Sequence, residues 1–209
     1  MKKYTKVIIF VLFLLVLTPF LGAQAEDTGA QFTSFAGFDL HTIKLTGVQN
    51  TLGPAKLVET GDAGEYTASV CYSVPGGVIL FLSGELDGPD HNLGGFGLAK
   101  ETDRLPCSKW PTGKQIPNLS IGGLHLGMSV SEFTQRVGAA VRMVGQIAYA
   151  DFESKRKLSQ AEIQRLPEEV QKMIKTGEEQ DYYDVMVSVI ATFNNGQLNE
   201  LRVWKTETL

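Results

Sequence analysis

The sequence lacks most of the residue patterns on which recognisable active sites depend. It contains only 2 cysteines, and its three histidines, His41, His91 and His125, lie far apart along the chain. It has no C-x-x-C pair, no G-x-S-x-G turn and no glycine-rich loop followed by Gly-Lys-Ser/Thr. We therefore predict no catalytic residue, no metal ligand and no cofactor. We interpret the histidines as surface or hydrogen-bonded side chains.

Long hydrophobic runs are also missing. The longest, Val7–Leu17, is shorter than the roughly 20 residues that a membrane-spanning helix needs. It follows the basic residues 1–6 and precedes Ala23-Gln24-Ala25, the small-residue pattern of a cleavage site. We therefore predict a signal peptide over residues 1–25, cleaved near Ala25, and a mature chain that begins near Glu26 with no stable membrane anchor. No cysteine lies near the cleavage site, which excludes a lipid anchor on a processed cysteine.

An excess of positive charge is absent. The formal net charge of the whole chain is −4, and loss of the lysines at positions 2, 3 and 6 with the signal peptide makes it −7. Nucleic acids and anionic membrane surfaces are bound by basic patches. We therefore predict that the mature chain binds neither, and that it resides in the periplasm or is secreted.

The two cysteines, Cys71 and Cys107, are predicted to form a structural disulfide, because an even pair in an exported chain meets an oxidising compartment. A metal pair and a redox pair are the alternatives. Neither is favoured, since the C-x-x-C spacing is absent and the nearest histidine, His91, is distant in sequence.

A proline-rich segment, residues 106–118, divides the chain. Proline fixes φ and removes a backbone donor, which disfavours both a helix and a central strand. We interpret this segment as a linker between a first α+β module, residues 26–105, and a second α+β module, residues 119–209.

The two halves carry a similar pattern. In the second half, Ser129 and Glu132 predict a capping box at the start of a short helix, and Gly138 is placed to end that helix. A shift of 85 residues puts Gly53 on Gly138 and the apolar positions of segment 43–53 on those of segment 128–138. This correspondence predicts a tandem repeat of two similar modules.

Strands are predicted at residues 66–74, 77–85, 95–100, 143–152, 184–193 and 198–205, where apolar residues alternate or run between turn signals. Asn195-Gly196 predicts a type I′ turn between the last two strands. The predicted fold class is α+β, with short helices packed on antiparallel strands that form an open sheet.

Residues 153–180 are strongly charged and predict a helical insertion in the second module. Pro167 divides it into two short helices, and Ile163, Leu166 and Val170 begin an apolar stripe. The insertion is either a partner-binding arm or an amphipathic cover over one side of the sheet, and we favour the cover.

Two motifs in the second half resemble a known superfamily. They are Leu126-Gly127-Met128-Ser129-x-Ser131-Glu132-Phe133, followed by Gly138, and the hairpin Phe193-Asn194-Asn195-Gly196-Gln197-Leu198. The pattern is similar to the small helix and strand module of the β-lactamase-inhibitor-protein and BamE (SmpA)-like superfamily. The resemblance implies an open antiparallel sheet flanked by helices and a role in binding another protein. The lipidated N-terminal cysteine of BamE-type proteins is absent here, and the resemblance assigns no functional residue.

Six side chains in or beside the predicted strands are candidates for a protein-binding face. Tyr, Trp and Arg are favoured at protein interfaces. The alternative is that these side chains cover the sheet beneath the charged helices. The six are Trp110, Tyr149, Tyr182, Tyr183, Arg202 and Trp204.

Asp87, Asp90 and His91 form a compact polar cluster whose oxygen atoms could hold Ca²⁺ weakly. The further spaced carboxylates of a calcium loop are missing, and the same residue types are ordinary turn formers. We therefore predict a turn.

These observations predict a protein that binds another exported or envelope protein, with inhibition of an enzyme as one form of that role. An envelope-assembly or scaffold factor is one alternative. An enzyme whose site is assembled from dispersed residues is the other.

The intact mass of the exported chain tests two of these expectations together. Under non-reducing conditions we expect a mass that starts near Glu26 and lacks the thiol hydrogens of Cys71 and Cys107. A mass that starts at Met1, or one that reduction leaves unchanged, contradicts the corresponding prediction.

Overall fold

The structure is a computed structural model that describes residues 29–100 and 106–209, so the predicted signal peptide lies outside the described residues. The elements of the first half are η1 (Ala30–Phe32), β1 (Ser34–Phe35), β2 (Phe38–Asp39), α1 (Leu45–Leu52), β3 (Val58–Thr60), β4 (Thr67–Val74), β5 (Gly77–Gly84), η2 (Glu85–Asp87) and β6 (Gly95–Ala99). Those of the second half are β7 (Ser108–Lys109), β8 (Ser120–Ile121), β9 (Leu124–His125), α2 (Val130–Val137), β10 (Arg142–Val144), β11 (Ile147–Lys157), α3 (Gln160–Ile163), α4 (Glu168–Thr176), β12 (Tyr182–Asn194) and β13 (Gln197–Thr208). The fold is α+β with an open sheet.

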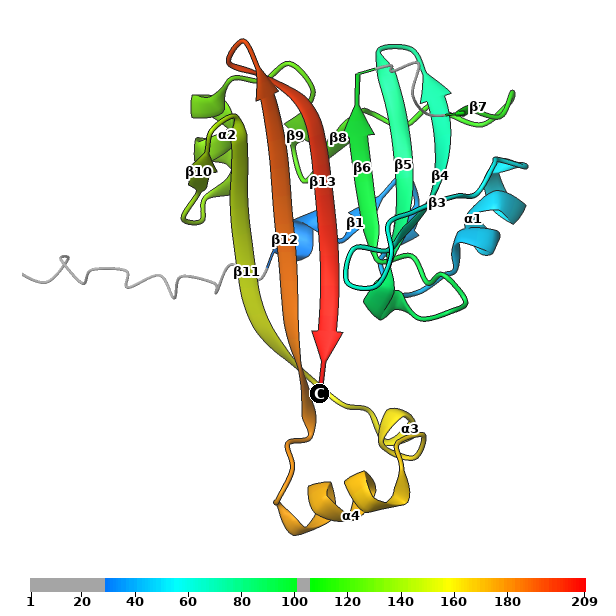
Figure 1. Cartoon of the computed structure of the whole chain (residues 1–209), viewed down its shortest axis with the longest axis vertical. Helices are drawn as coiled ribbons and strands as arrows, with labels where there is room; N and C mark the ends of the chain where they lie inside the picture. The colour runs from blue at the N-terminus through cyan, green and yellow to red at the C-terminus, as the bar shows by residue number, and fades with distance from the viewer. Residues whose placement is uncertain (1–28, 101–105) are drawn as a thin grey trace, which may run out of the picture.

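One sheet joins the two halves of the chain. Within the described residues it contains nine strands, eight of them in the order β10-β11-β12-β13-β6-β5-β4-β3, and β7 lies beside β4 (Figure 1). Neighbouring strands are antiparallel, apart from the parallel pair of β4 and β7. The last strands of the two halves, β13 and β6, meet in the middle.

One face of this sheet carries the main hydrophobic core. Helices α1 and α2, and the small hairpins β1-β2 and β8-β9, supply side chains to a single cluster that runs beneath both halves. Val48 of α1 and Phe133 of α2 are fully buried in it. Phe133 packs edge-on against Phe193 of β12, with ring centroids 5.5 Å apart, so the helix is fixed to the sheet by aromatic contact.

The capping pattern predicted for the second half is confirmed. The Ser129 hydroxyl accepts from the Glu132 N–H at 3.2 Å, and the Glu132 carboxylate accepts from the Ser129 N–H at 2.7 Å. Gly138 ends α2 in the left-handed conformation, with φ of +75°. The capping box thereby pairs two backbone N–H groups at the start of the helix with side-chain acceptors.

The strands predicted at residues 66–74, 77–85 and 95–100 correspond to β4, β5 and β6 within one residue at each end. The type I′ turn between β12 and β13 is also confirmed, because Asn195 and Gly196 have φ of +51° and +75°.

The single strand predicted at residues 143–152 is wrong. Gly145 has φ of +61°, and the chain turns back there, so the segment forms the hairpin of β10 and β11. Gly145-Gln146, the turn signal inside this segment, was missed.

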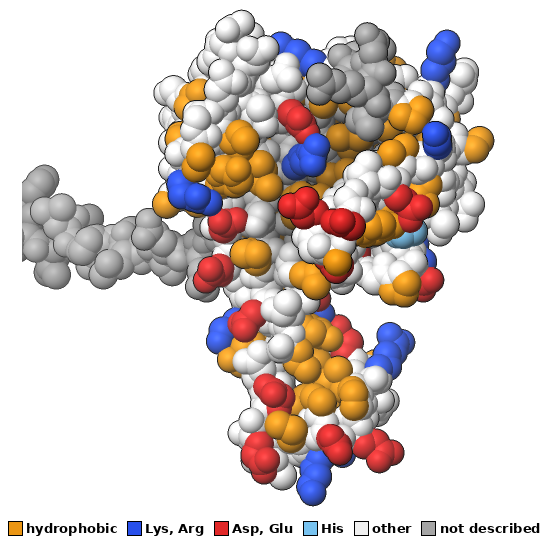
Figure 2. All heavy atoms as spheres, viewed as in Figure 1, with side chains coloured by type: hydrophobic (Ala, Val, Ile, Leu, Met, Phe, Trp, Pro, Cys, Tyr) orange, Lys and Arg blue, Asp and Glu red, His pale blue; other side chains and the backbone are white. Residues whose placement is uncertain are grey.

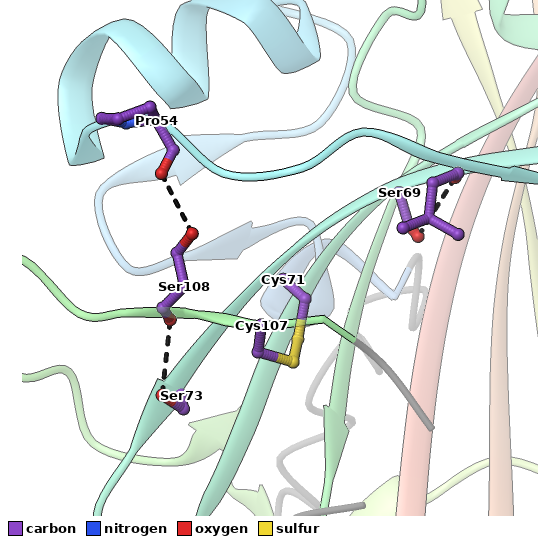
Figure 3. The surroundings of a disulfide bond; sticks show 7 residues. Pro54, Ser69, Cys71, Ser73, Cys107 and Ser108 are labelled. Carbon is purple, nitrogen blue, oxygen red and sulfur yellow. Dashed lines mark hydrogen bonds between the residues drawn. A yellow bond between two sulfur atoms is a disulfide. The ribbon is translucent and has the colours of Figure 1, made fainter. Parts of the chain in front are cut away.

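Residues 106–118 were predicted to be a linker. The start of this segment belongs instead to the large sheet, which corrects the prediction for those residues. Ser108 and Lys109 form β7 and pair with Tyr72 and Ser73 of β4. The Ser108 hydroxyl donates to the carbonyl of Pro54 at 3.0 Å (Figure 3). The predicted disulfide, Cys71–Cys107, lies directly beside this pairing (Figure 3).

The charged insertion differs from its prediction in extent and in position. Strand β11 continues to Lys157, so the insertion is shorter than the predicted residues 153–180. Helix α3 begins at Gln160, and Pro167 separates it from α4 as predicted. Neither helix contains a buried residue, and both lie beyond the end of the β11-β12 hairpin rather than over the sheet (Figure 1). The insertion is therefore not a cover. We call residues 158–181 the arm.

Removal of the disulfide should lower stability without changing the fold. The bridge closes a sequence separation of 36 residues, for which chain entropy gives about 3–4 kcal/mol. We expect the variant Cys71→Ala/Cys107→Ala to lose up to this amount in the free energy of unfolding, measured by urea titration against the oxidised protein. An unchanged midpoint would show that the β4-β7 pairing holds the segment without the bridge.

Candidate protein-binding face

The face of the sheet opposite the main core is exposed over β11, β12 and β13. Side chains alternate between faces along a strand. On β12, Val185, Val187 and Val189 are buried, whereas Met186, Ser188 and Ile190 point to the other face and are partly or fully exposed. We call this side the open face, and it is turned toward the viewer in Figure 2, where hydrophobic side chains surround a few charged ones.

Strand pairing brings side chains of the open face into rows. Tyr149, Ile190 and Arg202 lie side by side on β11, β12 and β13, and Asp151, Ser188 and Trp204 form the next row. Glu153, Met186 and Thr206 form the third. We call Tyr149, Met186, Ser188, Ile190, Arg202 and Trp204 the open-face patch.

Trp204 is held flat against the sheet at the border of the patch. Its cross-strand neighbour on β6 is Gly95, and a Cβ atom at position 95 would lie 2.8 Å from the Trp204 ring. Only glycine leaves room for this close approach. The ring also packs against a second buried cluster, formed by first-half residues of the same face with Leu80 and Leu82 at its centre. The first half of this face is therefore closed, and the exposed part is confined to β11–β13.

Tyr149 and Arg202 of the patch are oriented by charged neighbours. The Arg142 guanidinium lies over the Tyr149 ring, 4.8 Å from its centroid. Arg202 donates through Nε to the Glu200 carboxylate at 2.7 Å, and its side chain is 46% exposed. Arg202 therefore keeps donors available for a partner, because one carboxylate occupies only part of its guanidinium.

A hollow of about 960 Å³ deepens the lower end of the open face. Glu153, Lys155, Met186, Thr206 and Leu86 are among the residues that line it. Leu86 and Met186 are the most exposed large hydrophobic side chains there, at 76% and 41%. This hollow could receive an apolar side chain of a partner.

The six residues predicted as a binding face do not all meet. Tyr149, Arg202 and Trp204 are brought together on the open face, and Tyr182, the first residue of β12, lies on the same side. Tyr183 has the opposite parity, and Trp110 packs edge-on against the buried Tyr72 at 5.9 Å, on the core side. These two are corrections to the predicted set. Met186 and Ile190 were missed, although the alternation along residues 184–193 already placed them opposite the valines.

Tyr183 belongs instead to an ionic cluster that ties the arm to the sheet. The Arg156 guanidinium lies over the Tyr183 ring and donates to two carboxylates, Glu162 of α3 at 2.8 Å and Glu207 of β13 at 2.7 Å. Lys205 pairs with Glu207 at 2.6 Å. Burial raises the pKa of Glu207, but hydrogen bonds from Arg156 and Lys205 outweigh burial and lower it overall.

The polar cluster of Asp87, Asp90 and His91 is a turn, as predicted. Asp87 accepts from the Gly84 N–H at 2.5 Å, whereas Asp90 pairs with Lys44 at 2.6 Å. His91 stacks on Tyr66. The three side chains thus have separate partners, and among residues 29–100 and 106–209 no group of His, Cys, Asp or Glu is arranged to hold a metal ion. No helix in those ranges is long and apolar enough to cross a membrane.

Comparison with known proteins gives little support for an assignment. No family model matches the chain, and no curated protein matches it. A solved structure from Streptococcus mutans, described as a "putative beta-lactamase inhibitor protein", is 11% identical, with 79% of this chain and 82% of that chain covered and a TM-score of 0.24.

Acid should release the arm. Hydrogen bonds from Arg156 and Ser159 lower the pKa of Glu162 to about 2. A folded-state pKa below the ordinary value of 4.5 means that the stabilisation is fully present above that value and is lost as the pH falls toward 2. We expect the amides of α3 to lose hydrogen-exchange protection across this interval.

The variant Glu162→Gln should lack that protection at neutral pH and should show little further change in acid. Glu178→Gln, an exposed substitution in the same arm, is the matched control and should behave as the parent protein. Equal acid sensitivity in all three proteins would contradict the assigned anchor.

Proposed function

We propose that the protein is an exported binding module whose open-face patch contacts another exported or envelope protein. The observation that carries the proposal is the grouping of Tyr149, Ile190, Arg202 and Trp204 on a sheet face that no described helix covers. Interfaces are enriched in Tyr, Trp and Arg, and the residues that dominate binding energy are of these types. The Cys71–Cys107 bridge supports an oxidising location such as the periplasm or the extracellular space.

Inhibition of an enzyme is the form of binding that we favour. The patch lies on paired strands rather than on loops, and its large side chains are fixed by Gly95, Arg142 and Glu200. Such a surface loses little conformational freedom on binding, which favours a tight and lasting complex. A scaffold factor is the alternative, and it differs in leaving the activity of its partner unchanged. Turnover of a substrate by the purified protein would instead favour the enzyme alternative.

We further propose that the two halves are copies of one module. Each half has the order hairpin, helix and strands, and the bounds of α1 and α2 differ by 85 residues at both ends. The Leu93 N–H donates to the carbonyl of Ile43 at 2.8 Å, and the Leu198 N–H donates to the carbonyl of Met128 at 2.8 Å. These two bonds join the residue before each helix cap to the chain at the last strand of its half, two residues before β6 in the first half and within β13 in the second, which supports a common origin.

Capture of a partner from periplasm or culture medium, followed by measurement with the purified pair, tests the proposal. We expect Arg202→Ala and Tyr149→Ala each to raise the dissociation constant by at least about tenfold, the effect of removing an interface residue worth more than about 1.4 kcal/mol. The side chains are partly exposed, so folding should be preserved.

Arg136→Ala is the matched control, because Arg136 is an exposed arginine on α2, on the opposite side of the sheet. It should leave the affinity unchanged. Equal affinity for the parent, Arg202→Ala and Tyr149→Ala would show that the open-face patch is not the binding face.

A further inference from the structure

The two edges of the large sheet differ in how fully their outer strands are paired. At one end, β3 and β7 together flank β4, and the disulfide holds β7 in place. At the other end, β10 pairs only with residues 147–149 of β11. From Ala150 to Lys157 no strand in the described part of the chain pairs with the outer edge of β11. Backbone groups on such an edge are available to a further strand.

The hydrogen bonds between β11 and β12 show which residues of β11 point their backbone N–H and C=O groups toward the unpaired edge. The carbonyl of Gln146 accepts from Phe193, and the N–H of Leu158 donates to Asp181, both at 2.8 Å, so even-numbered residues face β12. The register between β11 and β12 is unbroken between these points. In an antiparallel pair the bonding direction alternates along the strand. The backbone groups of Asp151, Glu153, Lys155 and Lys157 therefore point outward.

The same four residues have side chains on the open face, in the order acidic, acidic, basic, basic. We propose that β11 pairs with β11 of a second copy of this chain, antiparallel and centred on Ser154, to form a symmetric dimer. In this register Asp151 lies opposite Lys157 of the second copy, and Glu153 lies opposite Lys155. All four pairs then join opposite charges, and outward-facing backbone groups meet outward-facing groups.

Neighbouring registers lack this match. The nearest registers that still bring outward-facing backbone groups together are reached by sliding one strand two residues along the other. In one direction this places Glu153 opposite Glu153, and in the other direction it places Lys155 opposite Lys155. Like charges directly opposite one another destabilise a strand pair, whereas opposite charges stabilise it. The sequence of the edge therefore selects one register.

Charged edge strands commonly prevent association. Here the separation of acidic and basic residues makes the edge complementary to itself. Lys155 and Lys157 are 61% and 79% exposed. Within the chain Lys155 donates to the Tyr182 hydroxyl at 2.8 Å and pairs with Asp184 at 4.0 Å, and Lys157 pairs with Asp181 at 3.1 Å, all of them at the surface. A strand has a neighbour on each side, so these lysines can contact β12 and the second copy together. The dimer axis stands perpendicular to the sheet, which places the two open faces on one side and leaves both patches exposed.

Charge reversal with complementation tests the dimer on the full chain by sedimentation velocity. We expect the parent to dimerise, and Glu153→Lys and Lys155→Glu each to raise the dissociation constant at least about tenfold, because each change acts twice across the axis. An equimolar mixture of the two variants should recover the dimer, because lysines of one chain then face glutamates of the other. A monomeric parent, or a mixture that stays monomeric, overturns the proposal, and these outcomes leave the binding function of the open face untouched.

A cysteine at the axis tests the register. Ser154 faces Ser154 of the second copy as a non-hydrogen-bonded pair, in which Cα atoms are about 4.5 Å apart, a distance that a disulfide can span. Ser154→Cys should form a covalent dimer on mild oxidation. Ser188→Cys, on the interior strand β12, is the matched control. It should form no covalent dimer and should run as a single chain on a non-reducing denaturing gel. Equal cross-linking of both variants would contradict the register.

Discussion

The pairing of β13 with β6 is the constraint on which the rest of the molecule depends. Five residue pairs, from Glu200 and Ala99 to Trp204 and Gly95, join the strands of the two halves into one sheet. On one face of this seam Leu98, Leu201 and Val203 are fully buried, so a single core serves both helices. On the other face Trp204 covers Gly95 and closes the first half. Without this pairing each half would expose the edge of its last strand and the apolar side chains beside that edge.

The seam also explains why the exposed side of the sheet is confined to the second half. First-half strands bury both faces, with Phe81 in the main core and Leu80 and Leu82 in the second cluster. Strands β11–β13 bury only one face, and their other face carries polar and aromatic side chains together. A half-buried antiparallel sheet of this kind is stable because one apolar face is sufficient for it. The remaining face is then free to differ in sequence, which suits recognition.

The extra length of β11 and β12 has a separate consequence, since it carries the arm away from the core. Helices α3 and α4 bury no residue, so their position depends on polar contacts rather than on apolar packing. Arg156, bound between Glu162 and Glu207, supplies such a contact at the root of the arm. The arm should therefore respond to pH and salt more readily than the sheet does.

Local patterns in the sequence determined the capping box of α2, the type I′ turn at Asn195-Gly196 and the strands β4, β5 and β6. They also determined the disulfide pair and the fold class. Each of these features rests on residues close together in the chain or on a single pair of cysteines. Sequence also placed Arg202 and Trp204 on the polar side of their strand. Tertiary structure alone decided that Trp110 and Tyr183 lie away from them, that β13 adjoins β6, and that residues 153–157 extend β11 rather than belong to the insertion. The reason is physical: alternation shows which side of a strand a residue occupies, but not which strand becomes its neighbour or where the sheet has its edge. For β11, the edge position accounts for the charges that the pattern alone attributed to the insertion.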